Sequence, residues 1–414
     1  MARIEPTIVR LIQPDWTQRV PSPAHDQLAP DDRRRYVAGN PDSFLTVTRG
    51  PEDVPPGEVW DSARAVAESR RSLERLLGAG AWGDPPPRPA LFLYRLSVDD
   101  GAGGEPHAQV GIVGLLSVDD YEQGVIRVHE LVHEHRARHL ADHLAGLRIQ
   151  SSPVALAHRA DPALSALVAG NTAARPPELD FTSPDGLRQQ VWRVDEPEVI
   201  RAVQDAMAGM PLYVIDGHHR SAAAAAHRRA HPDSEAARWL FGAVFAADEL
   251  RNEPFHRVVH GIDPDELVAL VGRRFPLRPV APGKVTAEVA GRRPEEVALL
   301  TGGRWYLVDL GPLPGPGEGD VLAGLDVVRL EERVLGPLLG ITTGSPAGRI
   351  AYRVADALQG GLDVWRTDPD EALWLMRPVP MDAVLDAADA GLAMPPKSTF
   401  FQPKARSGVF LRHH

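Results

Sequence analysis

The sequence contains no cysteine and only three lysines, and both shortages narrow the chemistry that the chain can carry. Without cysteine it can form no disulfide, no thiolate metal site and no thiol nucleophile. Arginine is the usual cation, so a lysine in a motif is more informative than an arginine; the lysines are Lys284, Lys397 and Lys404. No apolar run has the length that spans a membrane or that a signal peptide needs. We therefore expect a cytoplasmic protein without a membrane partner.

The chain has 414 residues, of which 43% are hydrophobic, and this suffices for a globular protein of two or three domains or one large domain. Its formal net charge is -11, whereas a nucleic-acid surface needs a concentrated basic face. We therefore expect no nucleic-acid partner. The sequence leaves the oligomeric state open.

Apolar residues in alternating and helical spacing predict a mixed α/β chain, of the α+β kind, in three regions. These are an N-terminal α/β region over 1–124, a core over 125–262 and a C-terminal α/β region over 263–414. Strands are predicted over 90–96, 110–118, 152–157, 190–194, 212–215, 239–245, 296–301, 304–310 and 372–377. Helices are predicted over 59–77, 161–171, 197–208, 263–275, 325–339 and 381–390. Residues 350–357 fit either a strand or a helix, and Gly-rich connections are predicted over 99–106 and 311–319.

The core is organised around residues 212–221, where an apolar strand runs into a tight turn and an alanine-rich helix. Leu212 to Ile215 is apolar, Asp216-Gly217 is a turn sequence, and the alanines begin at Ala222. At such a junction the first N–H groups of the helix have no partner inside the helix and carry the positive end of its dipole. The segment therefore predicts an anion site.

The side chains of this turn suit a phosphate group. Donors for phosphate oxygens come from five successive residues: Gly217, His218, His219, Arg220 and Ser221. Asp216 supplies an oxygen for Mg²⁺ or for orienting a histidine. The alternative interpretation is an ordinary strand-to-helix turn whose histidines are solvated or cap the helix.

A second candidate site lies at His129 and Glu130, before a helix predicted to continue to about residue 147. With His133 they match the HExxH pattern, in which two histidines one helical turn apart bind zinc and the glutamate is the general base. Two alternatives stay open. One is a solvated, histidine-rich helix face, and the other is Glu130 acting as a carboxylate without zinc.

The segment 394–408 concentrates unusual residues. It holds two of the three lysines, two hydroxyl groups and two adjacent aromatic rings: Lys397, Ser398, Thr399, Phe400, Phe401 and Lys404. This composition fits a charged loop over a site, in which the lysines and hydroxyls contact substrate or phosphate; the alternative is a terminal β-segment with aromatic anchors. His256 and Arg257 either reach the same site or satisfy a sheet edge.

These motifs together resemble those of the bacterial family named domain of unknown function 1015, over nearly the whole chain. The segments that carry the resemblance are 129–130, 216–220, 255–259 and 394–404. The His-Glu and Asp-Gly-His-His-Arg segments are also similar to archaeal free-serine kinases, which implies a ParB/sulfiredoxin-like nucleotide-binding core. The resemblance further implies that Glu130, beside His129, is the catalytic base for a substrate hydroxyl. It assigns the nucleotide phosphates to Asp216 through Arg220.

The chain departs from the family pattern at two places. His25 stands where the family usually has a tyrosine in an N-terminal proline motif, and Ala137-Arg138 stands where it usually has an Asp-Arg pair. These departures concern the identity of the substrate, whereas the nucleotide turn and the lysine-bearing tail are intact.

The sequence therefore predicts a nucleotide-dependent phosphotransferase that uses ATP or ADP with Mg²⁺. Its acceptor is the hydroxyl of a small molecule, free serine or a related amino acid. Phosphoryl transfer depends on positioning and charge neutralisation, and each part has a candidate residue. Two alternative functions remain, an HExxH zinc hydrolase and a non-catalytic nucleotide sensor that changes its partner contacts.

Overall fold

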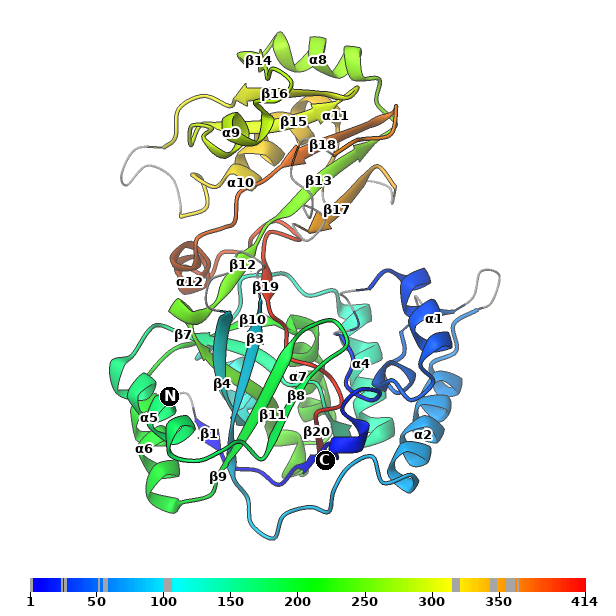
Figure 1. The fold of residues 1–414 in the computed structure, drawn as a ribbon, viewed down its shortest axis with the longest axis vertical. Helices are drawn as coiled ribbons and strands as arrows, with labels where there is room; N and C mark the ends of the chain where they lie inside the picture. Colours follow the sequence, from blue (N-terminus) through cyan, green and yellow to red (C-terminus); the bar gives the residue numbers. More distant parts are fainter. Residues whose placement is uncertain are drawn as a thin grey trace. The chain divides into compact units, whose positions relative to one another are not determined.

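The computed structural model describes residues 3–23, 25, 28–50, 53–54, 59–99, 106–314, 321–342, 348–354, 362 and 365–414. Most of the predicted 99–106 connection, part of the 311–319 loop and residues 355–357 lie outside these ranges. Over the described residues the chain is a mixed α/β protein, as predicted (Figure 1). None of the helices in these ranges combines the length and apolarity needed to cross a bilayer.

Contacts between residues divide the chain into two compact units. Unit 1 comprises Met1–Val128, Val132–Leu250 and Pro403–His414, and unit 2 comprises His129–Leu131 and Arg251–Gln402. The predicted division into 1–124, 125–262 and 263–414 stays a prediction. The two units are described separately below.

Unit 1 is built on a mixed sheet whose described strands follow the order β5-β10-β7-β11-β4-β3-β9-β8, with β1 beside β4. The strands are β1 (Ile4–Glu5), β3 (Leu91–Val98), β4 (His107–Ser117), β5 (Ile126–Arg127), β7 (Val154–His158), β8 (Leu179–Thr182), β9 (Arg188–Val194), β10 (Leu212–Asp216) and β11 (Trp239–Ala246). β10 is parallel to β5 and antiparallel to β7. Because β5 and β10 are parallel, the segments that follow Arg127 and Asp216 begin at the same edge of the sheet.

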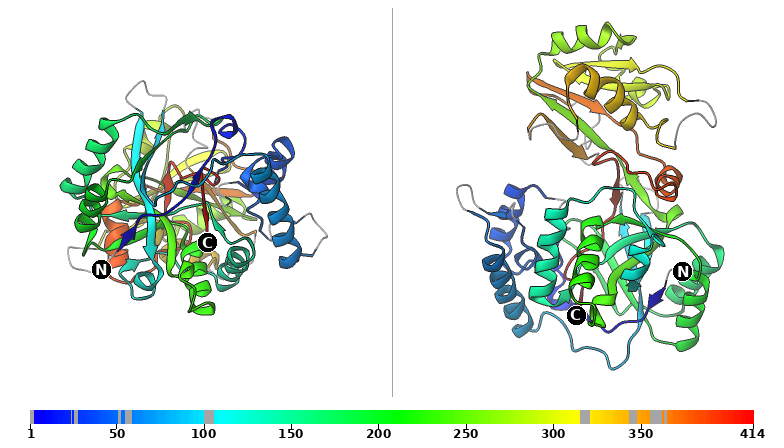
Figure 2. Two further views of the ribbon diagram at one scale, coloured as in Figure 1. Left: turned by 90° about the horizontal axis from the view of Figure 1, so that it is seen from below. Right: turned by 180° about the vertical axis from the view of Figure 1, so that it is seen from behind.

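Unit 1 also contains seven described α-helices. They are α1 (Pro30–Gly39), α2 (Ser62–Gly78), α3 (Val118–Glu122), α4 (Glu134–Leu147), α5 (Pro162–Ala174), α6 (Pro197–Met207) and α7 (His218–Ala230). α4 contacts both α2 and α7, and α5 contacts α6 (Figures 1 and 2). Three consecutive alanines of α7, Ala223, Ala224 and Ala225, are buried.

The last segment of the chain, 403–414, belongs to unit 1. It ends in the middle strand of a three-stranded sheet of order β2-β20-β6. These strands are β2 (Arg10–Leu11), β6 (Ile149–Gln150) and β20 (Phe410–His413). At the other end of the segment, Gln109 Nε2 donates to Pro403 O at 3.0 Å. The segment is held at both ends, and this fixes the position of Lys404.

Unit 2 is built on an antiparallel sheet whose described strands follow the order β14-β16-β15-β18-β13-β17. These strands are β13 (Phe255–His260), β14 (Leu277–Pro279), β15 (Glu296–Thr301), β16 (Arg304–Asp309), β17 (Ile350–Val354) and β18 (Glu371–Leu375). A separate pair is formed by β12 (Arg251–Glu253) and β19 (Phe400–Gln402). The helical segments are α8 (Pro264–Gly272), α9 (Val285–Ala290), α10 (Asp326–Leu330), a π-helix (Glu331–Leu335), α11 (Gly336–Leu339) and α12 (Met381–Asp389).

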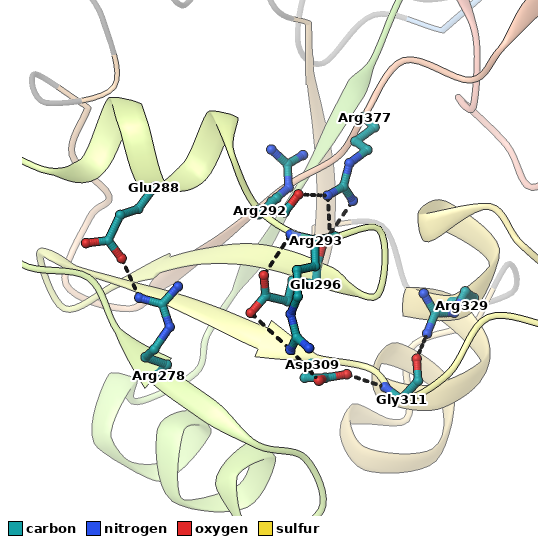
Figure 3. A network of polar contacts seen from close by, with 9 residues as sticks. All are labelled: Arg278, Glu288, Arg292, Arg293, Glu296, Asp309, Gly311, Arg329 and Arg377. Atoms are coloured by element: carbon teal, nitrogen blue, oxygen red, sulfur yellow. Dashed lines mark hydrogen bonds and ion pairs between the residues drawn. The ribbon is translucent and has the colours of Figure 1, made fainter.

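A network of arginines and carboxylates ties the strand ends of unit 2 together (Figure 3). Arg293 Nη2 lies 2.7 Å from Asp309 Oδ2, and the Arg293 backbone N donates to Glu296 Oε2 at 2.8 Å. Arg377 donates to the carbonyls of Arg293 and Glu296, and its backbone N donates to Asp326 Oδ2 at 2.8 Å. Burial raises the pKa of Asp326. Because these arginine and backbone N–H groups donate to carbonyls and carboxylates of the same unit, the network has a structural role.

The structure confirms the predicted strands and helices to within a few residues. Several short elements were not predicted, among them the strands β1, β2, β6, β8 and β14 and the helices α3 and α9. The predicted helix 325–339 is interrupted by the π-helix, and the ambiguous segment after residue 350 is the strand β17. Short or irregular elements of this kind depend on tertiary packing more than on local propensity.

Candidate functional site

The predicted turn is present at the end of β10, where Gly217 is the N-cap of α7. Gly217 has φ +94°, a left-handed conformation that side chains disfavour. A Cβ added there would lie 2.9 Å from atoms of the Arg220 guanidinium, which folds back over the turn. Glycine is therefore required both by the backbone angle and by the position of Arg220.

Asp216 holds two cations at this turn. Its Oδ2 accepts from Arg220 Nη2 at 2.5 Å, and its Oδ1 lies 2.6 Å from Lys404 Nζ. Arg220 is fixed further, because its Nη1 donates to the carbonyls of Ser152 and Pro153 at 2.9 and 2.7 Å. The Lys404 side chain is only 8% exposed. Two positive charges and one negative charge are thus fixed beside the first turn of α7.

His219 is held by a residue that precedes α4. The backbone N of His133 donates to His219 Nε2 at 3.3 Å, and the two rings stack with centroids 5.8 Å apart. Because Nε2 accepts, a neutral His219 carries its proton on Nδ1. The segment after β5 thus reaches the turn through His133 as well as through the pairing of β5 with β10.

Two of the predicted phosphate residues are buried. His218 is 4% exposed and Ser221 is 1% exposed, whereas Gly217, His219 and Arg220 are half-buried. Ser221 Oγ donates to Gly217 O at 3.3 Å, a hydrogen bond inside the helix. Their burial favours a packing role for these two side chains, so the accessible donors of the turn are the backbone, His219 and Arg220.

In unit 2, His129 is held by residues of the 394–401 segment. His129 is 1% exposed, and its Nε2 lies 3.2 Å from Thr399 Oγ1, 270 residues along the chain. Its carbonyl accepts from Met394 N at 2.8 Å, and its ring packs edge-on against Phe401 with centroids 6.4 Å apart. His129 is therefore an anchor, and the half-buried Glu130 follows it directly.

The helical premise of the HExxH interpretation is not met. α4 begins only at Glu134, with His133 as its N-cap, so His129 and His133 are not one turn apart on a helix. Over the described ranges, no group of three or more histidine, aspartate or glutamate side chains is arranged to hold a metal ion.

His256 and Arg257 were predicted either to reach the site or to satisfy a sheet edge, and both lie on β13, an inner strand that pairs with β17 on one side and β18 on the other. His256 is 1% exposed, and its Nδ1 accepts from Met376 N at 3.2 Å. Burial, with Arg292 and Arg257 nearby, lowers the pKa of His256 to about 3. Arg257 is also 1% exposed and donates to Phe255 O at 2.7 Å. The neutral His256 is therefore not a cation for a phosphate.

The two departures from the family pattern have different surroundings. His25 Nε2 lies 2.9 Å from Asp53 Oδ2, and Arg33 Nε donates to Asp53 Oδ1 at 2.7 Å. Burial opposes ionisation of Asp53, but the hydrogen bonds from His25 and Arg33 hold its pKa well below the usual range. Ala137 is buried on α4, and Arg138 pairs with Glu134 at the surface.

Some contacts that define the site had no local sequence signal. They are the carbonyls of Ser152 and Pro153 that fix Arg220, the stacking of His133 on His219, and the packing of Phe401 on His129. Each joins residues far apart in the sequence. The Asp-Gly-His-His-Arg turn, the His-Glu pair and the tail lysines pointed to their neighbourhood in advance.

A family model described as "Protein of unknown function (DUF1015)" matches residues 7–328. The chain belongs to this family. Comparison with curated proteins finds no match.

Solved structures similar to this DUF1015 chain share little sequence with it. A free serine kinase in complex with AMP is 12% identical, with a TM-score of 0.33, and the match covers 70% of this chain and 86% of that one. SbnI with C-terminal truncation from Staphylococcus aureus is 12% identical, with a TM-score of 0.36 and coverage of 71% and 85%. A conserved hypothetical protein from Pyrococcus furiosus is 11% identical, with a TM-score of 0.31 and coverage of 70% and 90%. At TM-scores below 0.5 these likenesses carry no argument about function.

Replacing Gly217 by alanine tests the geometry of the turn. We expect Gly217→Ala to lower the free energy of unfolding by roughly 1–3 kcal/mol, because the new Cβ meets the Arg220 guanidinium and the residue must keep a positive φ. Gly209 is a matched control, since its φ is +91° but a Cβ there has open space. Chemical denaturation should show a larger loss for Gly217→Ala than for Gly209→Ala. Equal losses would mean that the contact with Arg220 is unimportant.

Acid should destabilise unit 2 through His256. Its pKa in the folded protein is about 3, below the ordinary value of 6.5, so between these pH values the unfolded chain binds a proton that the folded chain does not. The free energy of unfolding should therefore fall as pH drops below 6.5, by about 2 kcal/mol at pH 5 from this group alone. In His256→Asn an amide oxygen can replace the Nδ1 acceptor without titrating.

The measurement is urea denaturation at pH 7 and pH 5, followed by tryptophan fluorescence, because the Trp365 ring lies 5.8 Å from the His256 ring. The variant should lose less stability than the parent between the two pH values. The same loss in both proteins would contradict a neutral, buried His256.

Proposed function

We propose that the protein is a nucleotide-dependent phosphotransferase whose phosphate site is the turn at the start of α7. The observation that carries the proposal is the fixed pair of cations, Arg220 and Lys404, on Asp216 beside the first turn of that helix. Phosphate oxygens are bound well by guanidinium, ammonium and helix N-terminal N–H groups. All three kinds of donor meet at this turn within unit 1.

The arrangement suits a charged ligand that binds and is then released. Asp216 compensates part of the charge of Arg220 and Lys404. A phosphate can take over those contacts without leaving a buried cation unpaired, which would be costly. The donors are already positioned, so little side-chain ordering is needed when the phosphate binds.

Glu130 remains the proposed general base for the acceptor hydroxyl. The support is the resemblance carried by the His-Glu pair and the position of Glu130 directly after the anchored His129. His129 was predicted as part of the catalytic pair, and its burial favours a role in positioning Glu130.

The turn is a poor Mg²⁺ site in this conformation, because both oxygens of Asp216 are paired with cations. Mg²⁺ would bind there only in place of Lys404 or Arg220. When bound to a nucleotide, Mg²⁺ neutralises phosphate charge and needs few protein ligands. We therefore propose that Mg²⁺ binds together with the nucleotide, and we assign no step to it.

The proposed acceptor is the hydroxyl of free serine or a related amino acid, as the resemblance implies, and the proposed donor is ATP or ADP. The segment with Lys397, Ser398 and Thr399 is the proposed contact with substrate. Ser398 is buried, and its Oγ donates to Pro395 O at 2.6 Å, so its hydroxyl shapes this segment. Thr399 is engaged with His129.

Loss of Lys404 should weaken nucleotide binding. Lys404→Ala removes one charge-assisted contact, so we expect the affinity for Mg²⁺-ATP or Mg²⁺-ADP to fall by roughly 1–3 kcal/mol in titration calorimetry. Lys284→Ala, at an exposed lysine in unit 2, is the matched control and should leave the affinity unchanged. If the unaltered protein binds no nucleotide with Mg²⁺ present, the proposed phosphate site is wrong.

Glu130→Gln should slow turnover without weakening nucleotide binding. It keeps the shape of the side chain and removes its basicity, so kcat should fall by about 10²–10⁴-fold. Glu134→Gln, at an exposed glutamate nearby on the chain, should keep its rate. The assay incubates each protein with ATP or ADP, Mg²⁺ and serine, threonine or homoserine, and detects the phosphorylated product by mass spectrometry.

Product formed by Glu130→Gln at the parent rate would rule out Glu130 as the base. Nucleotide binding without product from any acceptor would instead favour the nucleotide sensor.

A further inference from the structure

Lys397 has an unusual backbone conformation in unit 2. Its φ is +57°, and among the described residues only Arg148 is another non-glycine residue with positive φ. Arg148 is the C-cap of α4, a position where this conformation is common. Lys397 follows two prolines and has no such role. A long side chain held in this disfavoured region indicates that the surroundings impose it and that its placement matters.

A buried arginine imposes the conformation. Arg257, 1% exposed, donates through Nη1 to Lys397 O at 2.9 Å and through Nη2 to Pro396 O at 3.3 Å. Arg257 is itself paired with Glu331 at 3.5 Å, and Glu331 is the first residue of the π-helix. π-helical turns are frequent at functional sites. Arg257 thus acts on Lys397 through its backbone, as a positioning residue.

The side chain of Lys397 is presented without a carboxylate partner. Its Nζ lies 5.1 Å from the centroid of the Phe255 ring, and the residue is half-buried. No acidic side chain in the described part of the chain forms an ion pair with it, in contrast to Lys404. Phe255 also packs on Phe400, which keeps the ring in place. A half-buried ammonium over an aromatic face is held ready for an anion.

We propose that Lys397 binds the carboxylate of the acceptor and so selects acceptors that carry one. This inference rests on the proposed function and assigns one residue to the carboxylate by which the acceptor is recognised. A single ammonium matches the single charge of a carboxylate. The phosphates already have their own donors in Arg220, Lys404 and the start of α7 in unit 1.

The test uses the fact that the chain has only three lysines. Reductive methylation with ¹³C-formaldehyde labels the lysine amines and keeps their charge, and the Lys397 signal is assigned with Lys397→Gly and Lys284→Gly. The full-length protein is titrated with L-serine, L-homoserine, D-glycerate, L-serinamide and inorganic phosphate. We expect a saturable shift of the Lys397 signal with at least one of the three carboxylates and none with serinamide, which keeps the hydroxyl and lacks the carboxylate.

A second measurement separates binding from stability. Lys397→Gly relieves the positive φ, so its melting temperature should equal or exceed that of the parent, whereas its affinity for the carboxylate in calorimetry should fall at least about tenfold. Lys397→Arg, which keeps a cation, should recover part of the affinity. Lys284→Gly, at an exposed position, is the matched control and should leave the affinity unchanged.

Three results would overturn the proposal. They are a Lys397 signal that no carboxylate moves, a Lys397 signal that moves with phosphate or equally with serinamide, and a Lys397→Gly protein that melts earlier but binds as before. None of these readouts requires turnover. A carboxylate that moves Lys397 in a protein that transfers no phosphate would support this site and count against phosphotransfer alone.

Discussion

The carboxylate of Asp216 is the constraint on which the candidate phosphate site depends. Asp216 is the last residue of the buried strand β10, and its carboxylate is held between Arg220 and Lys404. Without it two cations would face each other with one charge fewer to compensate them, which a partly buried site tolerates poorly. Gly217 is the second part of the same constraint, because only a residue without a Cβ leaves room for the guanidinium to fold back onto Asp216.

The local chemistry of the turn is completed by distant segments. Lys404 lies on the segment that ends in β20, between β2 and β6. Arg220 is oriented by the carbonyls of Ser152 and Pro153, which precede β7. In unit 2 the same principle applies to His129, whose ring and carbonyl are held by residues of the 394–401 segment. The C-terminal segment therefore contributes to both units, and each contribution fixes a residue that the motifs had singled out.

Local pattern predicted the elements and the turn, but not the pairing of its side chains. Strand, glycine and alanine-rich helix follow from propensity and from the positive φ that glycine allows, so 212–226 could be predicted from the sequence. The pairing of Asp216 with Lys404 could not, because it depends on where the chain returns after the whole of unit 2. The HExxH spacing predicted zinc ligands only on the premise of a helix, and α4 starts one residue after His133. The burial of His218, Ser221 and His256 was likewise invisible, since polar residue types do not reveal which of them face the core.

The two lysines of the tail differ in a way that composition alone could not show. Lys404 is 8% exposed and already paired with Asp216, so an incoming anion exchanges with an existing partner. Lys397 has no carboxylate partner in the described part of unit 2, and Arg257 holds it through its backbone. An anion would therefore form an ion pair with Lys397 without displacing another carboxylate. The first arrangement suits a group that must bind and then leave, as a transferred phosphate does. The second would suit the recognition of a ligand that supplies the missing negative charge.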